Sequence, residues 1–367
     1  MYGVHTLILK HGLNFEQAAT ILKSDLDSFM DKIRRLKKNE SYIFNLNPHP
    51  LIRKLDIAVT KAYNASFPVF LRLQVAPLDI IEQRKTEAIF CLNGLNNIAF
   101  YNGLDNLLIE LFGGYSFIDK DCKKWDVNYI EYSANLYSEN VNLVLEMLKK
   151  NAKDVNAKFF NDGGYTLSIS KKAKHKRNSS TTAYNKAIAV QSLHEKEYES
   201  LRQEVDGYIR FERQLGRAYL WNQIAKKDEN RDNLDGYFNY KIAKHVLASS
   251  YSKIFCIGDF FSLKVMARYI KDKKLEKYAK SATQSRLIRC TKNNSKRGKG
   301  LSTATNNARI RAFEKECVSP VAIPRRSNID YLPNPIPNDW LPKSIGIKKI
   351  EHDILNIVQN SPNTWIQ

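Results

Sequence analysis

The sequence lacks any closely spaced pair of cysteines. Its five cysteines, Cys91, Cys122, Cys256, Cys290 and Cys317, are odd in number and widely separated, and no Cys-x-x-Cys pair occurs. A cysteine-based zinc site and a disulfide framework are therefore not indicated, and a reducing cytoplasm is expected. The sequence also has no apolar run of about 18 residues and no visible signal peptide. We expect a soluble cytoplasmic protein with no membrane partner.

Acidic residues are fewer than basic residues in this sequence. The chain of 367 residues has 58 Lys and Arg against 38 Asp and Glu, which gives a formal net charge of +20. Such an excess favours a polyanionic partner, most simply nucleic acid, although membrane-surface and ribosome-associated proteins share it. The hydrophobic content of 43% is sufficient for a real core, in one large or two ordinary domains.

Two segments alternate apolar and polar residues with the period of half-buried strands, Tyr165–Ser170 and Tyr208–Leu215. In the second segment Arg210 and Glu212 share one face with Tyr208. The opposite face carries three apolar residues that we expect in the core, namely Ile209, Phe211 and Leu215.

A basic run lies between these two strands and leads to a tyrosine at the start of a predicted helix, Tyr184, which is followed two residues later by Lys186. A phenol beside a run that can bind a polyanion suggests a nucleic-acid substrate. The cations of the run that we expect to contact DNA are Lys171, Lys172, Lys174, Lys176 and Arg177.

Strand-like and helix-like segments follow one another with basic loops between them. The segment Val127–Tyr132 places Tyr129 and Glu131 on one face, and Ser138 precedes a helix with a buried stripe over Val141–Lys150. This order predicts an α+β fold with an antiparallel or mixed sheet flanked by helices. Further strands are expected at 2–10, at two places within 41–59, and at 67–75. Further helices are expected within 86–112 and at 218–226, 240–250 and 260–271, the last capped by Asp259.

The Tyr184-x-Lys186 pair followed by the Arg210-Phe211-Glu212 strand resembles the replication initiators of filamentous phages, the gene II protein family, and more distantly the rolling-circle Rep proteins of plasmids. Val127–Ser133 with its following helix is similar to the family's acidic strand, and Phe70–Pro77 to a strand that ends in Ala-Pro. The resemblance covers residues 65–270. It departs from the family at Tyr129 and Glu131, where Arg and Asp are usual.

The resemblance implies a DNA nicking and closing endonuclease of a bacterial host cell. Tyr184 would attack a strand at a replication origin and retain its 5′ phosphate, while Lys186 and Arg210 hold the strand in line. Glu131 and Glu212 would hold Mg²⁺ or Mn²⁺. The implied partners are origin DNA and, from the host, a helicase and a DNA polymerase.

Several alternatives stay open on sequence alone. Asp56 is a rival to Glu131 as the upstream ligand, and Glu212 beside Arg210 and Arg213 is also compatible with a simple salt bridge. A tyrosine recombinase is disfavoured because no His-x-x-Arg motif occurs, and the absence of His-x-His points to initiators that use carboxylates. A non-catalytic basic DNA-binding protein remains the alternative function.

The two ends of the chain differ in character. Residues Phe15–Leu36 predict one amphipathic helix, which either belongs to a helix-turn-helix reader of DNA or simply packs against a sheet. We expect the first domain to end at residue 275. Residues 283–343 predict a flexible region, with a basic arm from Arg286 to Arg311 followed by a proline-rich linker, and 344–367 a short helix and tail.

Overall fold

The protein is represented by a computed structural model and divides into two compact units that alternate along the chain. The first unit comprises residues 1–134, 172–180 and 212–244, and the second comprises 135–171, 181–211 and 245–367. The predicted boundary at residue 275 is not the division found, because two earlier segments group with the C-terminal part. The structure describes residues 2–47, 49–61, 66–86, 88–153, 158–160, 166–170, 179–193, 198–217, 219–220, 234–275 and 303–360.

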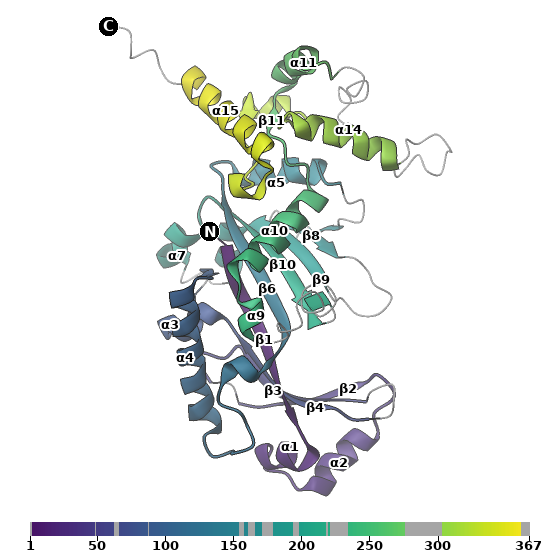
Figure 1. Ribbon diagram of the computed structural model, residues 1–367, viewed down its shortest axis with the longest axis vertical. Coiled ribbons are helices and arrows are strands. Elements are labelled where there is room, and N and C mark those ends of the chain that lie inside the picture. The colour runs from purple at the N-terminus through teal and green to yellow at the C-terminus, as the bar shows by residue number, and fades with distance from the viewer. Residues whose placement is uncertain are drawn as a thin grey trace. The chain divides into compact units, whose positions relative to one another are not determined.

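Antiparallel pairing organises the first unit around β1 (Tyr2–Leu13), which lies between β4 and β6 (Figure 1). Beyond β4 the sheet continues through β3 to β2, and β5 pairs with the start of β1. On the other side β6 is followed by β10, and both strands are shared between the units. The antiparallel sheet and the α+β class are thus confirmed. The strands are β2 (Ser41–Asn45), β3 (Lys54–Thr60), β4 (Val69–Val75), β5 (Phe90–Cys91), β6 (Asp126–Tyr137) and β10 (Tyr208–Gly216).

The longest helix of the first unit, α4 (Gly94–Phe112), packs on the short α3 (Pro77–Glu82). Gly103 permits the close approach, since a Cβ atom there would lie 3.0 Å from Ile80 Cγ2. The expected helix within 86–112 is confirmed over 94–112. Further along the chain, α9 (Leu234–Tyr237) also belongs to this unit.

The single N-terminal helix predicted over Phe15–Leu36 is wrong, because the segment folds as α1 (Phe15–Ile21) and α2 (Leu26–Arg34). Lys23 has a φ of 51°, and left-handed backbone ends an α-helix. Asp25 then caps α2 by accepting a hydrogen bond from the Ser28 amide at 2.8 Å, the local bonding that favours a new helix start.

The second unit holds the remaining helices and a two-stranded β11–β12 pair. The helix predicted over Val141–Lys150 is confirmed, with Val144, Leu145 and Leu148 buried. No helix in the described part of the chain is long and apolar enough to cross a membrane. The other elements are β7 (Lys158–Phe160), β8 (Thr166–Ser170), β9 (Ser179–Asn185), α6 (Lys186–Leu193), α7 (Tyr198–Val205), α10 (Tyr240–Ile254), which begins in the first unit, β11 (Phe260–Phe261), α11 (Leu263–Asp272), α14 (Thr303–Lys315), β12 (Tyr331–Leu332) and α15 (Lys343–Asn360).

The flexible region predicted over 283–343 is wrong for residues 303–343. The helix α14 covers the last part of the proposed basic arm, and the proline-rich stretch contains the buried residues Ile323, Leu332 and Ile336. Prolines restrict the backbone without preventing the apolar residues between them from packing. The rest of the arm, residues 286–302, lies outside the described residues. The predicted terminal helix is confirmed as α15.

Candidate metal centre

Three neighbouring strands of the first unit each contribute one potential metal ligand. His5 lies on β1, Glu131 on β6 and Glu212 on β10, and one ligand atom from each lies within 4.8 Å of the others. Both carboxylates are buried, with 6% of either residue exposed. The structure therefore brings together the two acids that the sequence predicted as ligands and adds a histidine.

A β-bulge explains how His5 reaches this group. Val4 pairs with Tyr132 and Thr6 with Glu131, so that His5 is the extra residue of β1 at a register shift. In a regular strand His5 would point to the face opposite Thr6, but a bulge re-aims the side chain. Its Nδ1 atom lies 2.8 Å from Glu131 Oε1.

The second oxygen of Glu131 also has partners. Its Oε2 atom accepts hydrogen bonds from the Tyr129 hydroxyl at 3.1 Å and from the Gln214 amide nitrogen at 3.0 Å. Burial opposes ionisation of Glu131, but the hydrogen bond and charge of His5, with the bonds from Tyr129 and Gln214, hold the pKa of the carboxyl below its ordinary value. Glu131 is thus held as a carboxylate.

Tyr129 lies on the same strand as Glu131 and orients its carboxylate by the hydrogen bond from its hydroxyl. Burial, followed by the charge of Glu131, raises the pKa of Tyr129 well above the ordinary value of a phenol. Its hydroxyl therefore stays protonated and donates to the carboxylate. A phenol in this state is unsuited to act as a nucleophile.

The arrangement fits a divalent cation. Ligand atoms at about 2.1 Å from one ion lie within about 4.2 Å of one another, which is close to the size of this group. A cation would replace the hydrogen bond between His5 and Glu131 and offset the charge of two buried carboxylates. Two carboxylates with one imidazole suit Mn²⁺ better than Mg²⁺, because imidazole is a softer ligand than oxygen.

The alternative upstream acid, Asp56, has a different environment. It lies on β3 with 2% of its surface exposed, and its carboxylate is 2.6 Å from Arg72 Nε and 3.3 Å from Lys54 Nζ. Two side-chain cations already balance this carboxylate. Asp56 is therefore a salt-bridge residue of the sheet, whereas Glu131 belongs to the group with His5 and Glu212.

The predicted nucleophile and its lysine belong to the second unit. Tyr184 is half-buried near the end of β9, and Lys186, which is 2% exposed, begins α6. The prediction that Tyr184 precedes a helix start is confirmed. The cations Lys171, Lys172, Lys174, Lys176 and Arg177 lie outside the described residues.

Arg210 does not fit the DNA-contacting role predicted for it. Its side chain has no exposed surface, and its Nε donates to Asn135 Oδ1 at 2.7 Å. A guanidinium in this position is unavailable to a phosphate group outside the protein. The apolar face predicted for the same strand is confirmed, because Ile209, Phe211 and Leu215 are all fully buried.

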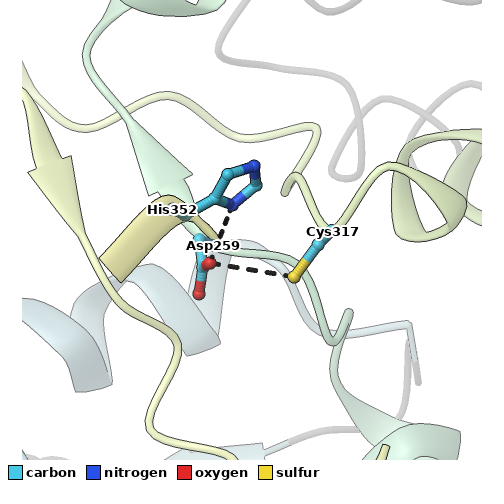
Figure 2. A group of neighbouring side chains, drawn as sticks. All are labelled: Asp259, Cys317 and His352. Carbon is cyan, nitrogen blue, oxygen red and sulfur yellow. Dashed lines mark hydrogen bonds and ion pairs between the residues drawn. The ribbon is translucent and has the colours of Figure 1, made fainter. Parts of the chain in front are cut away.

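A second group of potential ligands lies in the second unit, where Asp259, Cys317 and His352 converge (Figure 2). The Asp259 carboxylate lies 3.1 Å from His352 Nδ1 and 3.7 Å from Cys317 Sγ. It also accepts hydrogen bonds from Lys349 Nζ at 2.9 Å and from the Asn334 amide at 2.8 Å. Asp259 is thus the centre of a buried polar network.

This second group does not fit a metal ion. The Lys349 ammonium, itself buried, already supplies positive charge at Asp259 Oδ1. Burial, and then the charge of Asp259, raises the pKa of Cys317 to about 12, so that the thiol of the network is protonated near neutral pH. The network instead joins the segment before β11, the end of α14, the loop after β12 and α15.

The expected capping role of Asp259 is wrong. Ser262 is the N-cap of α11, with its side chain accepting from the Val265 amide, and residues 260–261 form β11. The sequence pattern of an acid before an apolar stripe fits either arrangement. Only the distant partners Lys349 and His352 show what Asp259 does.

His5 was missed by sequence reasoning. The segment was predicted as a strand, but a lone histidine in a strand carries no ligand signal, and its direction depends on a bulge that the local sequence does not mark.

Comparison with protein-family models, with curated proteins and with solved structures finds no match.

Proposed function

We propose that the protein is a replication initiator of the rolling-circle type, which nicks one strand of origin DNA and later rejoins it. One observation carries the proposal. Glu131 and Glu212 were selected as metal ligands from a resemblance between short motifs, and they converge within ligand distance although 81 residues (212 − 131) separate them. The net charge of +20 supports a DNA partner.

The chemistry assigned to the chain is a transesterification. The Tyr184 oxygen attacks the scissile phosphorus, the bond from phosphorus to the 3′ oxygen breaks, and that oxygen takes up a proton and leaves as a 3′ hydroxyl. The 5′ phosphate remains on Tyr184 as a phosphodiester, a host helicase would unwind the duplex, and a host DNA polymerase would extend the free 3′ end.

His5, Glu131 and Glu212 would hold the divalent cation in this scheme. The bound cation supplies charge stabilisation at the non-bridging phosphate oxygens. Tyr129 and Gln214 hold Glu131 in its ligating orientation by their hydrogen bonds. Lys186 is assigned to favouring the phenolate of Tyr184, since a nearby cation lowers the pKa of a phenol.

The test is nicking of supercoiled DNA that carries the cognate origin, in the presence of Mn²⁺ or Mg²⁺. The wild-type chain is expected to relax the plasmid and to label itself with the 5′ end, whereas Tyr184→Phe removes the attacking oxygen and abolishes both. Tyr208→Phe, at another half-buried tyrosine, is the matched control and should retain activity.

Two results would contradict the proposal. A covalent adduct that persists in Tyr184→Phe would reassign the nucleophile, with Tyr198 and Tyr208 next to be tested. A wild-type protein that shifts the plasmid on a gel without relaxing it under any divalent cation would be a binding protein without nicking activity.

A further inference from the structure

The segment after β1 has the local structure of a helix-turn-helix. Helix α1 of seven residues and helix α2 of nine are joined by the four residues 22–25, and the two helices lie side by side in Figure 1. Lys23 in the turn has a left-handed backbone conformation. In helix-turn-helix pairs that read DNA, the residue with this conformation is usually glycine. Asn14 and Asp25 cap the two helices through side-chain hydrogen bonds.

The inner surface of this pair is fixed to the sheet. Phe29 of α2 is 1% exposed and lies between two rings, with centroids 6.3 Å from Phe15 of α1 and 5.2 Å from Phe44 of β2. Ala18 and Ile33 are fully buried beside them. Helix α2 is therefore held by one face and leaves the opposite face to solvent.

The exposed face of α2 changes in character along its length. Near its start it presents Asp27 and Ser28, while Leu26, which is 40% exposed, lies at its edge beside the buried stripe of Phe29 and Ile33. Five exposed cations occupy its second half and the residues that follow, namely Lys32, Arg34, Arg35, Lys37 and Lys38. Asp31 of α2 lies 3.4 Å from Arg34 at an exposed position, where an ion pair is weak, and Lys32 Nζ lies 5.7 Å from the centroid of the Phe44 ring.

We infer that α1 and α2 form a sequence-reading site for duplex DNA, with α2 in the major groove. The start of such a helix contacts base edges, while cations further along contact phosphates. The face fits this division. Asp27 can accept from the cytosine N4 amine, and the cations at and after the end of α2 match the backbone charge.

The inference rests on the proposed function only in taking DNA as the ligand. It assigns origin reading to an element distinct from the metal centre and Tyr184, so that binding can be measured without nicking. The experiment selects tight binders from a library of randomised duplex DNA, with full-length protein in EDTA. We expect the wild type to enrich one motif that contains a cytosine.

The decisive variant is Asp27→Asn. Asparagine pairs with adenine where aspartate accepts from cytosine, so the motif should change from cytosine to adenine at one position, with a preference of about tenfold or more. Glu139→Gln removes an acid from an exposed position of the second unit and should leave the motif unchanged. The double variant Lys32→Gln, Arg35→Gln should weaken all duplexes alike and reduce the salt slope by about 2, since each phosphate contact contributes about 1.

Failure of this inference is distinct from failure of the proposed function. An Asp27→Asn protein with the wild-type motif, or a wild type that enriches no motif, would show that α1 and α2 do not read sequence. If the motif changes as expected while no metal restores nicking to the wild type, the reading site stands and the endonuclease assignment is lost.

Discussion

The His5–Glu131–Glu212 group and the Asp259–Cys317–His352 group each bring three potential ligands together, but the first holds two carboxylates and the second only one. Asp259 lies 2.9 Å from the Lys349 ammonium. In the other group two carboxylates share one buried site, and the partners of Glu131 are an imidazole, a phenol and an amide. A set of ligand types is therefore insufficient to identify a metal centre. A lysine that binds the one carboxylate of a group indicates a structural network, whereas two buried carboxylates and an imidazole within ligand distance offer three ligands to a divalent cation.

The largest expected effect distinguishes the two groups by activity. Glu212→Gln keeps the shape of the side chain but replaces a carboxylate by a poor ligand for a hard cation. The nicking rate per folded molecule should fall by about 10³, or about 4 kcal/mol in the activation free energy. Asp259→Asn, measured under the same conditions, should nick at the wild-type rate.

The opposite pattern would revise the comparison. If Glu212→Gln lowers the melting temperature and leaves the rate per folded molecule intact, Glu212 is a salt-bridge residue and the first group is structural. Equal losses in the rate per folded molecule in Glu212→Gln and Asp259→Asn would mean that nicking depends on both groups, and the distinction between them would be lost.

The second effect concerns stability. Asp259→Asn leaves the buried Lys349 ammonium without its counter-ion, and the free energy of unfolding should fall by about 3 kcal/mol. Lys349→Met should cost a similar amount. Asp259→Asn leaves the charge of Lys349 without its partner, and Lys349→Met leaves the charge of Asp259 without its partner. The double variant removes both charges, so its free energy of unfolding should fall by less than the sum of the two single losses. Urea unfolding of the four proteins provides the measurement, and strict additivity would mean that the pair is not coupled.

Metal-induced stabilisation gives a third, smaller effect. A cation that binds only the folded protein raises the free energy of unfolding by about 2.7 kcal/mol at about 100 times its dissociation constant. Mn²⁺ should therefore raise the melting temperature of the wild type and of Asp259→Asn, but not that of Glu131→Gln. A shift that disappears in Asp259→Asn and persists in Glu131→Gln would exchange the roles of the two groups.

The parts of the fold that were predicted correctly are those with local signals. Helix α5, strands β4 and β10 and the shared face of Tyr129 and Glu131 follow from residue periodicity, which acts within one element. The break between α1 and α2 was missed because Lys23 adopts a left-handed backbone that its residue type does not favour. The packed proline-rich segment was missed because its partners are distant in sequence.

The candidate site shows the same limit. Glu131 and Glu212 were found through a resemblance that recorded their order along the chain, whereas His5 depends on a bulge in β1 and on the neighbouring β6. Arg210 was given a DNA contact because its strand position is polar, yet both faces of that part of β10 are buried. Pattern indicates which face a residue occupies, and tertiary packing decides whether that face meets solvent.

The last and smallest effect is the pH dependence of the Asp259 network. Burial opposes ionisation of Asp259, but Lys349 and His352, with the Asn334 amide, lower the pKa of its carboxyl below the ordinary value. A group whose pKa is lower in the folded state stabilises the fold above its unfolded pKa, and this contribution is lost as the pH falls through the folded pKa. The advantage of the wild type over Asp259→Asn in urea unfolding should therefore be constant from about pH 7 to pH 5 and shrink below about pH 4, where the unfolded carboxyl takes up a proton. Asp27→Asn, at an exposed position of α2, is the control and should follow the wild type throughout. An advantage that grows toward acid pH would mean that Asp259 is protonated in the folded protein, and the network would then hold its lysine by some other acceptor.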